Sequence, residues 1–163
     1  MTEKDLEAEL RAANANRAIL YYLFFDELRK AVGEEQATTI LKAAIYRRGA
    51  EMAEPIARFA PDRIRELGAY HLAHSAGGGR IFNPEIGRLD EEGFEVLNTT
   101  CPLKEAWQAY GLSEEDVAKL CEIAAAVDYG KFEGAGFRFE CDTWKPGKRG
   151  CCTLKAYPGN AGK

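Results

Sequence analysis

The sequence predicts an α+β fold, in which an N-terminal helical segment packs on a small antiparallel sheet with two further helices. Three observations support this prediction. Apolar side chains recur at three- and four-residue spacing through the first third of the chain, glycines then interrupt the pattern, and short β-branched and aromatic runs follow. Helices therefore precede most of the strands instead of alternating with them, which is typical of antiparallel α+β domains.

The length of 163 residues predicts a single domain over 1–163. We expect a helical part over about 1–76, a glycine-rich loop over about 77–92 and an α+β part over about 93–157. The loop is expected because Gly77-Gly78-Gly79 cannot hold a helix and the turn-forming N-P-E-I-G follows.

The first helix begins at a capping-box pattern, Thr2 with Asp5, and ends at Gly33. Its middle, residues 19–25, is apolar nearly all round, which indicates burial on more than one side. This apolar surface makes the helix the candidate contact of a homo-oligomer.

The remaining elements follow from local signals. Prolines bend or end a second helix, and Gly130, Gly134 and Gly136 break the chain after the last helix. A turn, K-P-G-K-R-G, joins the last two strands into a hairpin. The expected helices are Glu34 to about Arg58, a short one from Asp62, Pro102–Tyr110 and Ser113 to about Val127; the expected strands are Phe94–Thr100, Phe137–Trp144 and Cys151–Tyr157.

Composition excludes several classes of protein. The formal net charge of -4 argues against a nucleic-acid binder, because phosphate contacts need a basic field. No apolar stretch is long enough for a bilayer, and the acidic N-terminus lacks a secretory signal. We therefore expect a cytoplasmic protein without nucleic-acid or membrane partners. Five cysteines, an odd number, point away from a disulfide framework in that compartment.

Cys101, Cys121 and Asp128 are the first candidates for chemistry. Cys121 and Asp128 are seven positions apart, so they share one helix face with core residues. Cys101 precedes a helix start, where backbone N–H groups and the helix dipole favour a thiolate. The alternative for each cysteine is a small buried hydrophobe, which is common.

Cys151 and Cys152 are expected in the last strand, where adjacent side chains face opposite sides, so only one of them can face a given pocket. His71 and His74 lie on one helical face and are candidates for a base or a metal ligand, or are unremarkable histidines at a polar helix end. The cysteine spacing fits neither a structural zinc site nor an iron–sulfur site, so we expect no cofactor.

The second half of the chain carries a longer pattern: C-P-L-x-x-A-W-x-x-x-G-L-S, then L-C-x-I-x-x-x-V-D-Y-G, then G-C-C-T-L. Over about residues 94–156 this pattern resembles the L-2-amino-thiazoline-4-carboxylic acid hydrolase family. The resemblance implies a hydrolase that opens the C–N bond of a small cyclic amidine. It also matches Cys101, Cys121, Asp128 and either Cys152 or Cys151 to positions of the family's motifs. We therefore expect a catalytic set of Cys101, Asp128, Cys121 and Cys152. From the convergence of these positions we further expect a substrate-binding set of Trp107, Tyr129, His71, His74 and Cys151, and no metal.

Within that implied site, Asp128 acts as base or orienting group and Cys101 as nucleophile or on the oxyanion side. Trp107 and Tyr129 form pocket walls, and His71 or His74 donates a proton. Two other readings of the sequence remain open. One is a non-catalytic sensory domain that binds a small molecule, cofactor or metal in a cysteine-lined pocket. The other is a structural or assembly protein.

Overall fold

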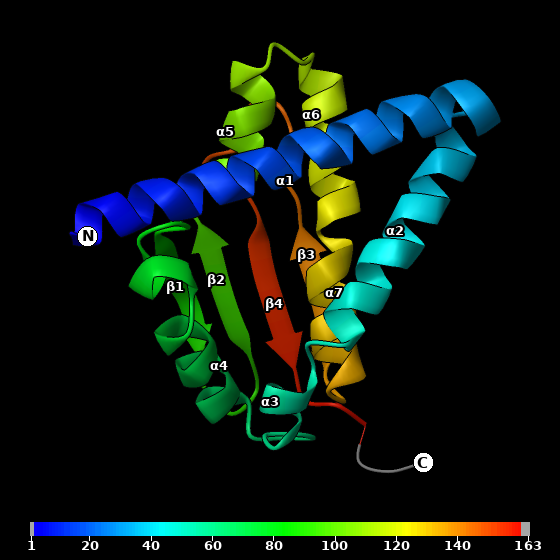
Figure 1. Ribbon diagram of the computed structural model, residues 1–163. Coiled ribbons are helices and arrows are strands. Elements are labelled where there is room, and N and C mark those ends of the chain that lie inside the picture. The colour runs from blue at the N-terminus through cyan, green and yellow to red at the C-terminus, as the bar shows by residue number, and fades with distance from the viewer. Residues whose placement is uncertain (1, 161–163) are drawn as a thin grey trace.

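The computed structural model describes residues 2–160 as a four-stranded sheet with helices over one face and across one end (Figure 1). The helices are α1 (Glu3–Val32), α2 (Glu34–Ala50), α3 (Glu54–Ala57), α4 (Ile64–Ala73), the 3₁₀ segment η1 (Ala76–Gly79), α5 (Pro102–Ala109), α6 (Glu114–Ala124) and α7 (Ala126–Gly134). The strands are β1 (Pro84–Leu89), β2 (Phe94–Asn98), β3 (Arg138–Asp142) and β4 (Thr153–Tyr157). This architecture confirms the predicted α+β class.

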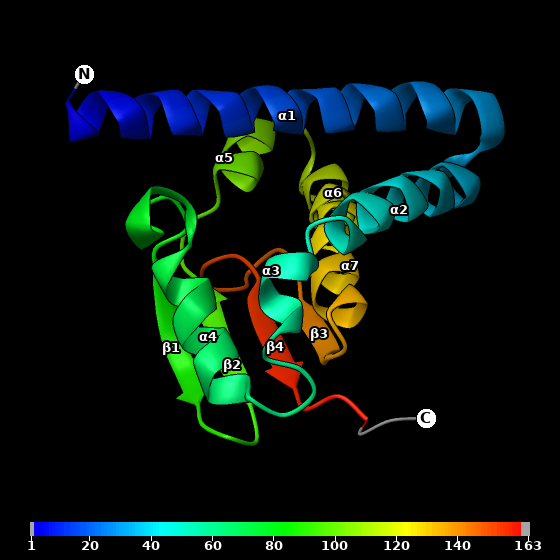
Figure 2. The same ribbon diagram turned by 60° about the horizontal axis from the view of Figure 1, so that its bottom comes forward.

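The sheet has the order β1-β2-β4-β3, and each neighbouring pair is antiparallel. The strands alternate between apolar and charged side chains, so the two faces of the sheet differ. Helices α4 and α7 lie over the apolar face (Figures 1 and 2). On the other face, Glu95 pairs in register with Lys155, and Lys155 with Glu140. The core therefore sits between the helices and one face of the sheet.

Helix α1 is one long helix that runs across one end of the sheet (Figure 2). Its capping box is formed as predicted, with Thr2 and Asp5 exchanging hydrogen bonds. The indole N–H of Trp107 donates to the Ala18 carbonyl at 2.6 Å, which ties α5 to the middle of α1. Because both residues are buried, breaking this bond would leave a polar pair without partners.

The apolar middle of α1 is only partly covered in a single chain. Ala18 and Phe25 are fully buried, whereas Leu20, Leu23 and Phe24 keep 42%, 41% and 56% of their surface exposed. The expected contact with a second subunit through this helix stays a prediction.

The first turns of α1 are held down by exposed ion pairs. Arg11 reaches Glu105 of α5 at 3.4 Å and donates to the Arg80 carbonyl at 3.3 Å. Arg80, next to η1, in turn lies 3.7 Å from Glu7. Charges therefore join the N-terminal end of α1 to two other segments.

Helices α2 and α7 touch through their backbones. A Cβ on Gly49 would collide with the Val127 carbonyl oxygen, and one on Gly130 would collide with the Tyr46 carbonyl oxygen. The sequence-based expectation that Gly130 breaks the chain was therefore wrong. Glycine lowers helix propensity, but here it permits a contact that no other residue allows, so α7 continues to Gly134.

Other boundaries also differ from the predictions. The helix expected from Ser113 to about Val127 is divided into α6 and α7 at Ala125, although Ser113 caps it as expected. The second helix ends at Ala50, before the proline-led α3. At each of these breaks the chain changes direction between one helix and the next.

Strand β1 lies where the sequence predicted a loop over 77–92. It is an edge strand, which begins at Pro84 and has a register shift between Ile86 and Arg88. An edge position tolerates the missing proline N–H, and a bulge accommodates Gly87. Proline and glycine were therefore misleading local signals.

Within residues 2–160, no helix has an apolar stretch that could cross a bilayer.

We predict that Gly130→Ala and Gly49→Ala each lower the free energy of unfolding by about 3 kcal/mol, since the new methyl group forces the two backbones apart. Helix propensity alone would change stability by about 1 kcal/mol in the opposite direction. Urea denaturation measures the difference. Gly87→Ala is the control, because its nearest neighbours are Glu95 side-chain atoms at 3.4 Å. Equal stability of Gly130→Ala and wild type would contradict the role of the contact.

Candidate functional site

A cavity of about 530 Å³ lies at the end of the sheet, where Arg17 and Tyr21 of α1 line it together with Asn98 at the end of β2. Its walls come from α1, α2, α4, α5, the α6–α7 junction, the end of β2 and the approach to β4. All of the sequence-predicted site residues except Tyr129 line it: Cys101, Cys121, Asp128, Cys151, Cys152, Trp107, His71 and His74. Residues from both halves of the chain thus meet in one cavity.

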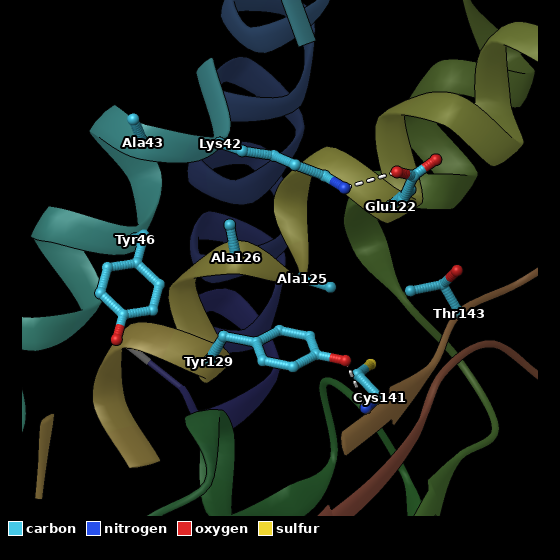
Figure 3. Close-up of a pocket in the computed structure, with 9 residues that line it drawn as sticks. All are labelled: Lys42, Ala43, Tyr46, Glu122, Ala125, Ala126, Tyr129, Cys141 and Thr143. Atoms are coloured by element: carbon cyan, nitrogen blue, oxygen red, sulfur yellow. Dashed lines mark hydrogen bonds and ion pairs between the residues drawn. The ribbon is translucent and has the colours of Figure 1, made fainter. Parts of the chain in front are cut away.

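Tyr129 lies elsewhere. It lines a second hollow of about 450 Å³, where its hydroxyl accepts a hydrogen bond from the Cys141 N–H at 3.1 Å (Figure 3). Neighbouring helical side chains point about 100° apart, so Asp128 and Tyr129 reach different sides of α7. The structure therefore does not bring Tyr129 to the cavity that holds Asp128.

Three cations in the cavity were not among the predicted site residues: Arg17 of α1, Arg48 of α2 and Lys131 of α7. Arg17 recurs at helical spacing with the apolar Leu10 and Ala13. A cation within this stripe of core-facing residues was the sequence feature that could have identified it as a cavity residue. Lys131 is one turn after Asp128 and shares its helix face.

Asp128 is the only Asp or Glu side chain that lines the cavity among residues 2–160. Burial raises the pKa of this carboxyl to about 6, with the nearby Cys152 adding to the effect and the charges of Lys131 and Arg17 opposing it. A carboxyl with a pKa close to the working pH can both accept and release a proton. Asp128 is therefore suited to general acid–base chemistry.

The two histidines occupy different environments. Burial between Phe94 and Phe132, together with the Lys131 charge, lowers the pKa of His71 to about 4, so its ring is neutral at pH 7. His74 is exposed, stacks on Tyr70 and places its Nδ1 2.9 Å from the Tyr70 carbonyl oxygen. A neutral His71 serves poorly as an acid.

Cys101 stands at the N-cap of α5, as the sequence suggested. Its interaction with the Cys151 thiol and with the N–H groups of Lys104 and Leu103 lowers the pKa of the Cys101 thiol, against the opposing effect of burial. The first-turn amides of α5 thus favour a thiolate facing the cavity.

Cys151 and Cys152 both line this cavity, and their Sγ atoms are 3.7 Å apart. The expectation that only one of them faces a given pocket was wrong. Regular pairing of β4 begins only at Thr153, so the strict alternation of a strand does not apply to the dipeptide before it.

Across residues 2–160, no group of three or more His, Cys, Asp or Glu side chains is arranged to hold a metal ion. The contacts of the thiols are with one another and with backbone amides.

Comparisons with known proteins agree with this picture of the fold. The family model described as L-2-amino-thiazoline-4-carboxylic acid hydrolase matches residues 12–155. The structure resembles a trafficking protein particle complex subunit 3 from Naegleria fowleri covalently bound to palmitic acid. The TM-score is 0.61 at 10% identity, over 93% of this chain and 98% of that one. This likeness shows a shared fold alone. A comparison with curated proteins finds no match.

We predict that Asp128→Asn raises the free energy of unfolding at pH 7 by up to about 3 kcal/mol, because it removes an ionised carboxylate that burial disfavours. The raised pKa means that the folded protein binds the proton more tightly than the unfolded chain between about pH 4 and 6. The part of the wild-type free energy of unfolding that comes from this proton is therefore lost as pH rises through that window. The variant has no such carboxyl and does not lose it.

Urea denaturation between pH 4 and 8 measures this effect. His71 acts in the opposite sense, since its lowered pKa destabilises the fold as pH falls below about 6.5. The exposed Asp62→Asn is the matched control. Identical pH profiles for Asp128→Asn and wild type would show that the carboxylate is well solvated.

Proposed function

The chain belongs to the L-2-amino-thiazoline-4-carboxylic acid hydrolase family, and from this premise we propose that it is a hydrolase of small cyclic amidines that cleaves a C–N bond. The observation that carries the proposal is the cavity that joins a thiolate-favouring Cys101, a high-pKa Asp128 and three cations. We propose that it acts in the cytoplasm on a free small molecule.

The cations favour an anionic substrate. Arg17, Arg48 and Lys131 outnumber the single carboxylate of Asp128 on the cavity wall. A substrate carboxylate, such as that of 2-amino-thiazoline-4-carboxylate, would pair with Arg17 or Lys131. The buried Trp107 would form an apolar wall against the ring.

In the proposed reaction the Cys101 thiolate adds to the amidine carbon of the ring, and the resulting tetrahedral carbon expels the ring nitrogen. Asp128 gives that nitrogen a proton as it leaves. Water then adds to the same carbon, Asp128 takes up a proton, and the carbon–sulfur bond to Cys101 breaks to restore the thiolate. The sum is the addition of one water, giving S-carbamoyl-cysteine from the thiazoline.

Asp128 thus takes the proton-donor role that the sequence placed on His71 or His74. A ring with a pKa near 4 holds little proton at neutral pH, and His74 lies at the exposed rim. We assign His71 to hydrogen bonding with the substrate in its neutral form.

A second candidate function is non-catalytic binding, in which a cavity thiol holds a ligand covalently. The fold neighbour in the comparison is itself covalently bound to palmitic acid. In this chain Cys101 and Cys152 both line the cavity of about 530 Å³. A bound adduct without turnover would favour this reading.

Mass spectrometry of 2-amino-thiazoline-4-carboxylate incubated with the purified protein tests the hydrolase. We expect enzyme-dependent conversion to a product heavier by one water. A stable protein adduct, or unchanged substrate at high enzyme concentration, would count against hydrolysis and favour the binding function.

Among variants, we expect Cys101→Ala to lower kcat/KM by about 10³-fold or more and Asp128→Asn by about 10²- to 10⁴-fold. Arg17→Ala should act mainly by raising KM, because it removes substrate binding and not the reacting groups. Cys141→Ser, which changes a thiol outside the cavity, is the matched control. Full activity of both Cys101→Ala and Asp128→Asn would refute these roles.

A further inference from the structure

The adjacent thiols of Cys151 and Cys152 converge although their backbone is held in place. The Cys151 N–H donates to the Asn98 carbonyl at 2.8 Å, and the Asn98 N–H donates to the Cys152 carbonyl at 3.0 Å. Both ends of the dipeptide are thus fixed to the end of β2. With the main chain pinned, the Sγ–Sγ separation of 3.7 Å is set by side-chain rotation alone.

The two thiols differ in environment. Cys151 is buried and also interacts with the thiols of Cys101 and Cys121. Cys152 is half-buried, and Cys141 lies beside it on the side of the second hollow. Both residues line the cavity, but Cys152 keeps more of its surface exposed than Cys151 does.

Cys152 carries thiolate character. The Cys141 and Cys151 thiols, the Trp144 N–H and the positive charge of Lys148 all lower the pKa of Cys152. Contacts with the thiols of Cys101, Cys121 and Cys152, together with burial, raise the pKa of Cys151, so this thiol stays protonated. A thiolate that faces a cavity is the form of cysteine that attacks hydroperoxides.

We propose that Cys151 and Cys152 form a reversible oxidation site, in which a hydroperoxide oxidises Cys152 and the neighbouring Cys151 closes a vicinal disulfide. The site is independent of the proposed hydrolase activity, although closing it would alter the wall of the same cavity.

The Cys152 thiolate attacks the outer oxygen of the hydroperoxide, the O–O bond breaks, and the alkoxide or hydroxide that leaves takes up a proton. Cys152 is then a sulfenic acid, two electrons more oxidised. The Cys151 sulfur attacks it, the S–O bond breaks, and the departing hydroxide takes the Cys151 proton as water.

The geometry also makes the disulfide easy to reduce. The Cα atoms of adjacent residues are about 3.8 Å apart, below the usual 4.4–6.8 Å of disulfides, so the closed ring is strained. Strained disulfides have more oxidising potentials and are reopened by the cellular glutathione pool. The closed form is therefore a transient state and not a structural staple.

Tryptic digestion distinguishes this pair from every other. Cleavage after Arg149 and Lys155 leaves Gly150–Lys155, which holds Cys151 and Cys152 and no other cysteine. The other three cysteines fall on separate peptides: 89–104, 120–131 and 139–148. After treatment of the full chain with one equivalent of hydrogen peroxide and alkylation of free thiols, we expect Gly150–Lys155 unalkylated and about 2 Da lighter. Reduced glutathione should restore two alkylation sites.

Two variants sharpen the test. Cys151→Ser should leave Cys152 as a sulfenic acid that dimedone captures, since its partner thiol is gone. Cys141→Ser should still form the lighter peptide. The proposal is overturned if Gly150–Lys155 is cross-linked to 89–104 or 139–148, or if it remains doubly alkylated while another cysteine oxidises. Each readout is a peptide mass, so it stands whether or not the thiazoline is hydrolysed.

Discussion

The contact between the backbones of α2 and α7 fixes much of the rest of the structure. Because Gly49 and Gly130 allow the two helices to touch, α7 has little freedom to rotate about its axis. That fixed rotation sends Asp128 and Lys131 to the cavity and Tyr129 to the hollow on its other side. A methyl group at the contact would thus disturb the site as well as the stability, although neither glycine touches the cavity.

The second constraint is the partial dehydration of charged groups in that cavity. One carboxylate and several thiols are held away from bulk water, and their proton affinities diverge according to whether a neighbour can stabilise the anion. The Cys151 thiol and the helix amides lower the pKa of Cys101, whereas the thiols of Cys101, Cys121 and Cys152, together with burial, raise the pKa of Cys151. A single cavity therefore contains thiols of the same residue type whose pKa values shift in opposite directions because their surroundings differ.

Local signals in the sequence predicted features that depend on neighbouring residues. The capping box at Thr2, the cap at Ser113 and the antiparallel hairpin of β3 and β4 all follow from a few adjacent positions, and the family pattern selected cavity residues. The failures involve long-range contacts. Gly130 is helical because of a partner 84 positions earlier at Tyr46, and β1 exists because β2 pairs with it. The side chain of Cys151 does not follow the alternation of a strand, because its N–H is bonded to Asn98 before the regular pairing of β4 begins.

The ion pairs that hold the start of α1 have a further consequence for how the structure responds to salt. Arg11, Arg80 and their acidic partners are exposed or half-buried at the surface, so dissolved ions screen them, whereas the Trp107–Ala18 bond farther along the helix is buried and unaffected. The helix therefore has a salt-sensitive end and a salt-insensitive middle. Since η1 also borders the cavity through Ala76, we expect ionic strength to change how firmly the start of α1 holds against this side of the cavity.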